Sequence, residues 1–191
     1  SLIVVVGLLI GYLIARRRSF ATAALDTLLM VPYLVPGIVM GIALVTRFNV
    51  PPLAITGTGL IIILAIFVRR LPYASRAVAM ALRQLSPSLE EAAISLGYRP
   101  WKAFMKVTVP LIAPGIMAGA LMSFVTAMNE LSASLVLYVG GTITMPVRIY
   151  LSVMDGEYGT ASAMATILLG LTVLSVYAAF RLSGRKQSIL L

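Results

Sequence analysis

The chain has 191 residues, of which 60% are apolar and 11% are charged. Soluble domains are roughly 45–50% apolar and about 25% charged, so the composition excludes a disordered chain, a nucleic-acid-binding domain and a typical cytosolic enzyme. Lys and Arg outnumber Asp and Glu by 15 to 6, which gives a net charge of +9. The sequence contains no Cys and no His, which removes disulfides, thiolate metal sites and His-based catalysis.

Apolar segments recur along the chain and predict membrane spans. They cover residues 2–15, 27–45, 53–68, 111–139 and 160–180. A span needs about 20 residues. The first segment is shorter and starts at Ser1 rather than Met, so we expect a truncated transmembrane helix in a fragment of a longer protein. The predicted fold is an all-α membrane protein, a polytopic helical bundle of about five transmembrane helices, as a single domain over residues 1–191.

The second segment contains residues that disturb helices. Pro32, Pro36, Gly37 and Gly41 all fall within it. Proline frees backbone groups that lipid cannot satisfy. Two interpretations stay open: a kinked helix buried among its neighbours, or a discontinuous helix that lines a solute path.

The basic residues indicate the orientation in the membrane. Basic residues favour cytoplasmic loops, so we place Arg16–Arg18 inside and alternate from there. The 16–26 loop, the long polar stretch 69–110 and the tail from residue 181 are then cytoplasmic. Every basic residue except Arg47 and Arg148 lies inside. The model has its N-terminus outside and its C-terminus in the cytoplasm, and the positive charge needs no nucleic acid partner.

Within 69–110, local signals predict a short helix that ends at a glycine. Ser88 with Glu91 fits a capping box, and Ser86 with Pro87 at the first helical position is an alternative start. Gly97 suits a left-handed C-terminal cap.

A second short helix can begin at Pro100, and Pro110 closes the loop before the fourth segment. The predicted result is a compact cytoplasmic knob that exposes Ala92, Ala93 and Leu96. Basic residues beside it would suit either an anionic lipid surface or a protein partner, and both stay open on these grounds.

The same stretch carries a long, spaced motif. Glu91-Ala92-Ala93 is followed four residues on by Gly97 and then by Val107-Thr108-Val109-Pro110. This resembles the EAA loop of ABC-importer permeases, with Val107 and Val109 where Ile and Leu are usual. The resemblance implies a coupling helix that inserts into a separate ATP-binding cassette ATPase, and it implies a bacterial-type inner membrane location. It further implies a second permease subunit or half and an extracytoplasmic solute-binding protein. The implied coupling positions are Glu90, Glu91, Ala92, Ala93, Gly97 and Pro110.

The fourth segment holds the only carboxylate within a predicted span, Glu130. A mid-membrane charge costs about 2.5–3.5 kcal/mol on insertion scales and usually faces a cavity or the bundle interior. Helical spacing places Ser123, Thr126, Glu130 and Ser134 on one face. With Asn129, they are the candidate solute path; hydrogen bonding between helices is the alternative.

A short helix is expected from Pro146 to about Asp155. The stretch from Asn129 to Gly159 that contains it is similar to ferric iron permeases, which are commonly proteins of two fused halves. That similarity suggests ferric iron as the solute and a C-terminal half as the piece. The function expected is a permease subunit of an ATP-driven importer, with no enzymatic activity, cofactor or metal site of its own; no P-loop motif occurs in the sequence. A gradient-driven secondary transporter with Glu130 as ion or proton site is the alternative, and a membrane scaffold or sensor is a third class.

Overall fold

The protein is helical throughout the part of the chain that the structure describes. The computed structural model describes residues 1–17 and 19–187, and no β-strand occurs among them. In chain order the elements are α1 (Leu2–Arg16), α2 (Phe20–Leu34), α3 (Gly37–Phe48), α4 (Gly59–Gln84), α5 (Ser88–Ser95), α6 (Pro100–Ala103), the π-helical turn η1 (Phe104–Thr108), α7 (Val109–Met128), α8 (Ser134–Leu137), α9 (Met145–Met154) and α10 (Tyr158–Gln187). The all-α fold class is confirmed.

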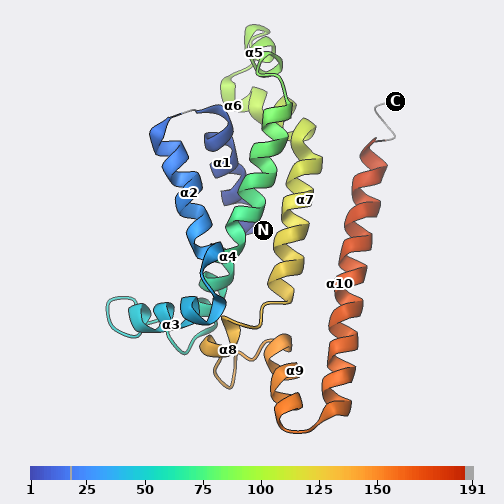
Figure 1. Cartoon of the computed structure of the whole chain (residues 1–191). Helices are drawn as coiled ribbons and strands as arrows, with labels where there is room; N and C mark the ends of the chain where they lie inside the picture. The colour runs from blue at the N-terminus through green and yellow to red at the C-terminus, as the bar shows by residue number, and fades with distance from the viewer. Residues whose placement is uncertain (18, 188–191) are drawn as a thin grey trace.

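The long helices share one direction. Figure 1 shows α1, α2, α4, α7 and α10 running roughly alongside one another, with α3, α8 and α9 gathered at one end and α5 with α6 at the other. We call these the α3 end and the α5 end. Helix α10 brings the chain from the α3 end back towards the α5 end.

Glycines let α1 and α7 approach α4 closely from two sides. A Cβ atom built on Gly11 of α1 would lie 2.6 Å from the carbonyl oxygen of Ser75, and one on Gly7 would lie 2.6 Å from the Cβ of Ala74. On α7, a Cβ on Gly115 or Gly119 would lie 2.5 or 2.8 Å from alanine Cβ atoms of α4. Each pair is spaced four residues apart, the arrangement that brings helix backbones together in membranes. Helix α4 is therefore the centre of the bundle.

The second apolar segment is broken rather than kinked. Helices α2 and α3 meet at an angle of 103°. Pro32 is accommodated inside α2, whereas Val35 takes extended backbone angles directly before Pro36. The residue before a proline is disfavoured in the helical region, so the helix stops there and restarts at Gly37 in a new direction. The segment is thus a discontinuous helix rather than a kinked one, and that it lines a solute path stays a prediction.

Helix α4 corrects the expected third segment and the polar stretch after it. The expected span 53–68 ends at Arg69 and Arg70, but α4 runs from Gly59 to Gln84 and contains both arginines. The residues 69–84 are thus part of the bundle, not of a cytoplasmic loop. Hydropathy counts each arginine as a bare charge and therefore ends the segment at Arg69. In the fold, carboxylates on other elements compensate these charges, so the helix continues.

The fourth expected segment also ends at a different residue. The expected segment 111–139 ends early, because α7 stops at Met128 and the side chain of Asn129 donates to the carbonyl oxygen of Val125. The segments 2–15 and 160–180 fall within α1 and α10. The short helix expected from Pro146 to about Asp155 is confirmed as α9.

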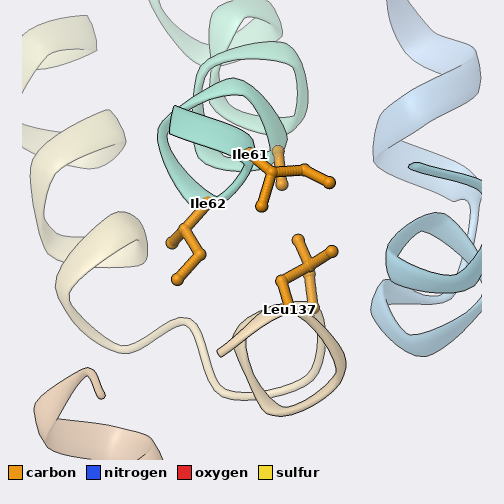
Figure 2. Close-up of a cluster of buried hydrophobic side chains, with 5 residues drawn as sticks. Ile61, Ile62 and Leu137 are labelled. Atoms are coloured by element: carbon orange, nitrogen blue, oxygen red, sulfur yellow. The ribbon is translucent and has the colours of Figure 1, made fainter. Parts of the chain in front are cut away.

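The apolar core forms separate clusters along α4. Near the α3 end, Ile61 and Ile62 of α4 face Leu137 of α8 (Figure 2). Towards the α5 end, Val78 and Leu82 pack with Ile112 of α7. Both clusters join α4 to the α7–α8 part of the chain.

The long helices include some that can cross a membrane by length and composition. In the described part of the chain these are Pro100–Met128 and Tyr158–Arg181, with α2 and α3 as a third if the broken pair is one span. Helix α1 is shorter and apolar, and α4 has 26 residues but carries four arginines. Apolar helices of membrane length support a multi-pass membrane protein, and the number of five spans stays a prediction.

We predict that the replacement Gly11→Ala destabilises the bundle. The new methyl group would press on a backbone carbonyl that cannot rotate away, and overpacking typically costs about 1–3 kcal/mol. Thermal unfolding of the full-length parent in detergent measures this as a lower Tm. Gly170→Ala in α10 is the matched control, because its Cβ meets open space and alanine favours a helix. An equal Tm for both variants would contradict the close contact.

Candidate functional site

Helix α5 begins at Ser88, one residue after the alternative start that the sequence left open, in which Pro87 is the first helical residue. Pro87 has helical backbone angles, and the hydroxyl of Ser86 accepts a hydrogen bond from the N–H of Ser88 at 3.4 Å. The capping box of Ser88 with Glu91 is wrong, because Ser88 already lies inside the helix. Glu90 and Glu91 occupy the first turn, where carboxylates suit the positive end of the helix dipole.

Gly97 ends α5 as the sequence predicts. Its φ is +93°, a region that glycine enters without strain. The N–H of Gly97 donates to the carbonyl oxygen of Ile94, and the N–H of Tyr98 donates to that of Ala93. These two bonds make a Schellman cap. A Cβ on Gly97 would meet no atom within 4 Å, so the backbone conformation, not space, requires glycine here.

The carboxylate of Glu90 attaches α5 to the bundle. It accepts hydrogen bonds from the hydroxyls of Tyr12 in α1, at 3.2 Å, and of Thr108 in η1, at 3.1 Å. Thr108 is fully buried. The ring of Tyr12 lies edge-on to Phe104, with ring centroids 4.8 Å apart. Sequence reasoning grouped Glu90 with the coupling positions, but it could not show that this side chain turns inwards.

The outer surface of the knob is apolar with a charged border. Glu91 and Ala92 are exposed, as are Leu96 and Trp101, at 82% and 65%. Ala93 was expected on this surface but is buried, because it faces the bundle from α5. The outer surface therefore presents Glu91, Ala92, Leu96 and Trp101 together.

Pro110 does not close a loop. The helical stretch that begins at Pro100 continues through Pro110 to Met128. The π-helical turn η1 precedes it, and the N–H of Val109 reaches back to the carbonyl oxygen of Phe104. Proline has no N–H to continue the ordinary ladder, and the wider turn accommodates this gap. The knob is consequently continuous with α7.

A buried ion-pair cluster lies at the other end of α7. Glu130 is 5% exposed, and its carboxylate pairs with the guanidinium groups of Arg69, at 2.8 Å, and Arg70. It also accepts the N–H of Ala133 at 3.1 Å. Both carboxylate oxygens are thus occupied, which compensates much of the cost of burying three charges.

The polar stripe expected on one helix face is wrong. Helix α7 ends at Met128, so Glu130 follows the helix and Ser134 belongs to α8. The remaining candidates bond to nearby backbone: Ser123 donates to the carbonyl oxygen of Arg70, Thr126 to that of Met122, and Asn129 to that of Val125. Ser134 is buried, and its hydroxyl has no hydrogen-bond partner among the described residues. The candidates do not form one continuous surface.

Over residues 1–17 and 19–187 no three Asp or Glu side chains come together in a way that could hold a metal ion.

We predict that Glu130→Gln strongly destabilises the protein. The change leaves two arginines buried without a counter-charge, and breaking a buried ion pair typically costs about 3–5 kcal/mol. Thermal unfolding of the full-length parent in detergent should show a clear fall in Tm. Glu157→Gln, an exposed carboxylate between α9 and α10, should leave the Tm unchanged. A Glu130→Gln protein as stable as the parent would show that the cluster is not structural.

Comparisons with known proteins identify the family. The family model for the "Binding-protein-dependent transport system inner membrane component" matches residues 5–188. The ferric transport system permease protein FbpB of Actinobacillus pleuropneumoniae is 39% identical over 85% of the chain, which spans 24% of that protein's length. The sulfate transport system permease protein CysT of Escherichia coli is 30% identical over 95% of the chain and 70% of its own length.

Solved structures share the fold. An inward-facing MetNI methionine ABC transporter matches 94% of the chain and 85% of its own, with a TM-score of 0.73 and 21% identity. A bacterial alginate ABC transporter in complex with an alginate-bound periplasmic protein matches 96% of the chain and 71% of its own, with a TM-score of 0.76 and 18% identity. Because the family model covers far more than half of its residues, this chain belongs to the binding-protein-dependent transport system inner membrane components, which are membrane transport permeases and not enzymes.

Proposed function

We propose that the chain is the membrane path of an ATP-driven importer and couples to a separate ATPase through α5. The observation that carries this proposal is the α5 knob, which stands out from one end of the bundle (Figure 1). Its shape is fixed by the Schellman cap at Gly97, and its outer surface is apolar with Glu91 at the border. A rigid, exposed apolar projection suits insertion into a groove of a partner.

The contacts behind the knob would pass its motion into the membrane. Glu90 connects α5 to Tyr12 of α1 and to Thr108 of η1. Both α1 and α7 pack on α4 through glycines. A displacement of α5 by the ATPase would therefore move the three central helices together, the mechanical requirement for changing access to a solute path.

The basic residues support a cytoplasmic α5 end. The ends of α1 and α4 meet the knob at the α5 end. Four basic residues lie there: Arg16, Arg83, Arg99 and Lys102. Positive charge favours the cytoplasmic side. Arg69 and Arg70 do not count towards the basic charge of this end, because they lie within α4 and pair with Glu130. Arg18 and the side chains of Arg185 and Lys186 lie outside the described residues. We propose a bacterial-type inner membrane, with the C-terminus in the cytoplasm.

The assembly would include more chains. The relatives named for ferric iron are roughly three and a half times as long as this chain, because the 163 residues matched in one of them are 24% of its length, so a second permease half or subunit would complete the path. The alginate transporter structure contains a periplasmic binding protein, and we propose an extracytoplasmic binding protein at the α3 end.

Ferric iron is the solute that the relatives favour. Two ferric permease relatives match at 39% and 38% identity, compared with 30% for a sulfate permease and for a 2-aminoethylphosphonate permease. The chain's own residues offer no cluster for bare iron among those described, so recognition of the metal would rest with the binding protein.

A gradient-driven carrier centred on Glu130 has little support. An ion or proton site needs a carboxylate that can exchange its partner. Both oxygens of Glu130 are held by arginines and by a backbone N–H. Its position identifies a structural ion pair.

We predict that Glu91→Lys in the full-length parent lowers co-purification of the ATPase by about tenfold or more, because a reversed charge at an interface is strongly unfavourable. Glu91 is exposed, so the Tm of the membrane part should not change. Glu157→Lys at the α3 end is the control and should leave the ATPase bound. Equal recovery of the ATPase with Glu91→Lys and with the parent would remove this surface from the contact.

A further inference from the structure

Helix α4 carries a basic stripe that the ion pair with Glu130 does not explain. Arg69, Tyr73, Arg76 and Arg83 are spaced four, three and seven residues apart, which places them on one face of the helix. The contacts with α1 and α7 use other residues of α4, namely Ala74, Ser75, Ala77, Val78 and Ala81, although Gly119 of α7 also lies against the backbone carbonyl of Tyr73. From Arg69 to Arg83 the stripe covers about 21 Å of helix at 1.5 Å per residue.

The middle of the stripe, at Arg76, lies at membrane depth, whereas Arg83 lies at the α5 end of α4. Gly7 and Gly11, in the middle of the apolar helix α1, contact α4 at Ala74, Ser75 and Val78. Arg76 is therefore level with the centre of α1. Its side chain is nevertheless 48% exposed. An exposed arginine at this depth is costly against lipid and usually faces a water-filled path.

The partners of the stripe leave it with excess positive charge. Among the described residues Arg76 has one charged partner, with its Nε at 3.3 Å from a carboxylate oxygen of Asp26, so its Nη groups remain available. Arg83 is exposed and forms no ion pair with a described residue. Four arginines of α4 thus face two carboxylates, Asp26 and Glu130.

Space and further polar groups accompany these charges. A hollow of about 630 Å³ near the α5 end is lined by Arg83, Asp26, Ser19 and Thr22, among others. Nearer the α3 end, the rings of Tyr33 in α2 and Tyr73 in α4 meet edge to face at 5.6 Å, and Tyr33 is 41% exposed. The polar surface between α2 and α4 therefore runs from the ion-pair cluster to the hollow.

We propose that this surface of α4 and α2 is the solute path and that the solute crosses it as an anion, either a free oxyanion or ferric iron complexed by one. The proposal rests on the proposed permease function and names its substrate class. Guanidinium groups with free Nη atoms bind oxyanions through paired hydrogen bonds. A bare ferric ion would be repelled by the same groups. The path moves from the stripe expected along α7 to the surface between α4 and α2, and it keeps Glu130 only as the partner of Arg69 and Arg70.

The test measures uptake by the full-length parent, assembled with its ATPase and binding protein in vesicles. The variants are Arg76→Gln and Arg83→Gln on the stripe, and Arg47→Gln in α3 as the control, because Arg47 lies off the stripe beside Phe48. We expect each stripe variant to lower uptake by about tenfold, as for the loss of a charge-assisted hydrogen bond. Arg47→Gln should keep the parent's rate.

A double variant separates solute contact from simple charge balance. Asp26→Asn with Arg76→Gln removes both charges of the pair and leaves no unpaired carboxylate. Uptake that stays low in the double variant supports a contact with the anion. Uptake that returns to the parent's rate shows that Arg76 only neutralises Asp26, and this overturns the proposal.

The solutes supplied distinguish the two sources of the anion. Labelled sulfate or phosphate that enters without iron indicates a free oxyanion. Ferric iron that enters only with phosphate, together with labelled phosphate, indicates a complex. Iron uptake that needs no oxyanion and is unchanged by Arg76→Gln and Arg83→Gln overturns the proposal. Co-purification of the ATPase from the same samples separates these results from a failure of the permease function, in which the ATPase would be missing from the unmodified parent as well.

Discussion

The close approach of α1 and α7 to α4 is the contact on which the rest of the bundle depends. Glycines four residues apart on both outer helices remove the side chains that would hold the backbones away. In a membrane, apolar side chains gain little by leaving lipid, so close van der Waals packing has to hold helices together. Because α4 is enclosed on these two sides, Arg69, Arg70 and Arg76 find their partners on the connection between α7 and α8 and on α2. The packing thus determines where the polar surface of the protein lies.

The ion pairs follow from this enclosure. Arg69 and Arg70 emerge where α7 has ended, and Glu130 in the connection to α8 neutralises part of their charge. A Cβ on Gly37 would lie 2.6 Å from the Cβ of Ser132 and 3.0 Å from the backbone nitrogen of Ala133, so α3 can begin beside the cluster only with glycine at that position. The break between α2 and α3 and the end of α7 are therefore parts of one arrangement around buried charge.

The sequence predicts local structure better than it predicts which side chains meet. Gly97, Pro100 and Pro36 act through backbone preferences of one or two residues, and their effects appear in the structure. The end of α4 could not be found by hydropathy, because Arg69 and Arg70 look like a cytoplasmic boundary until their distant partner is known. Glu130 was placed on a helix that had already stopped at Met128. Two signals were available in the sequence and were not used: the glycine pairs 7/11 and 115/119, and the helical spacing of Arg69, Tyr73, Arg76 and Arg83.

The central claim is that the α5 knob docks on an ATPase, and site-specific photo-crosslinking tests it directly. A photoreactive amino acid replaces Leu96, the most exposed apolar side chain of the knob at 82%, in the full-length parent in its native membrane. A second protein carries it at Val50, which is 53% exposed and follows α3 at the opposite end. The account predicts a crosslink from position 96 to a P-loop ATPase, absent from position 50. Crosslinks from position 96 to lipid alone, in a complex that still transports, would contradict it.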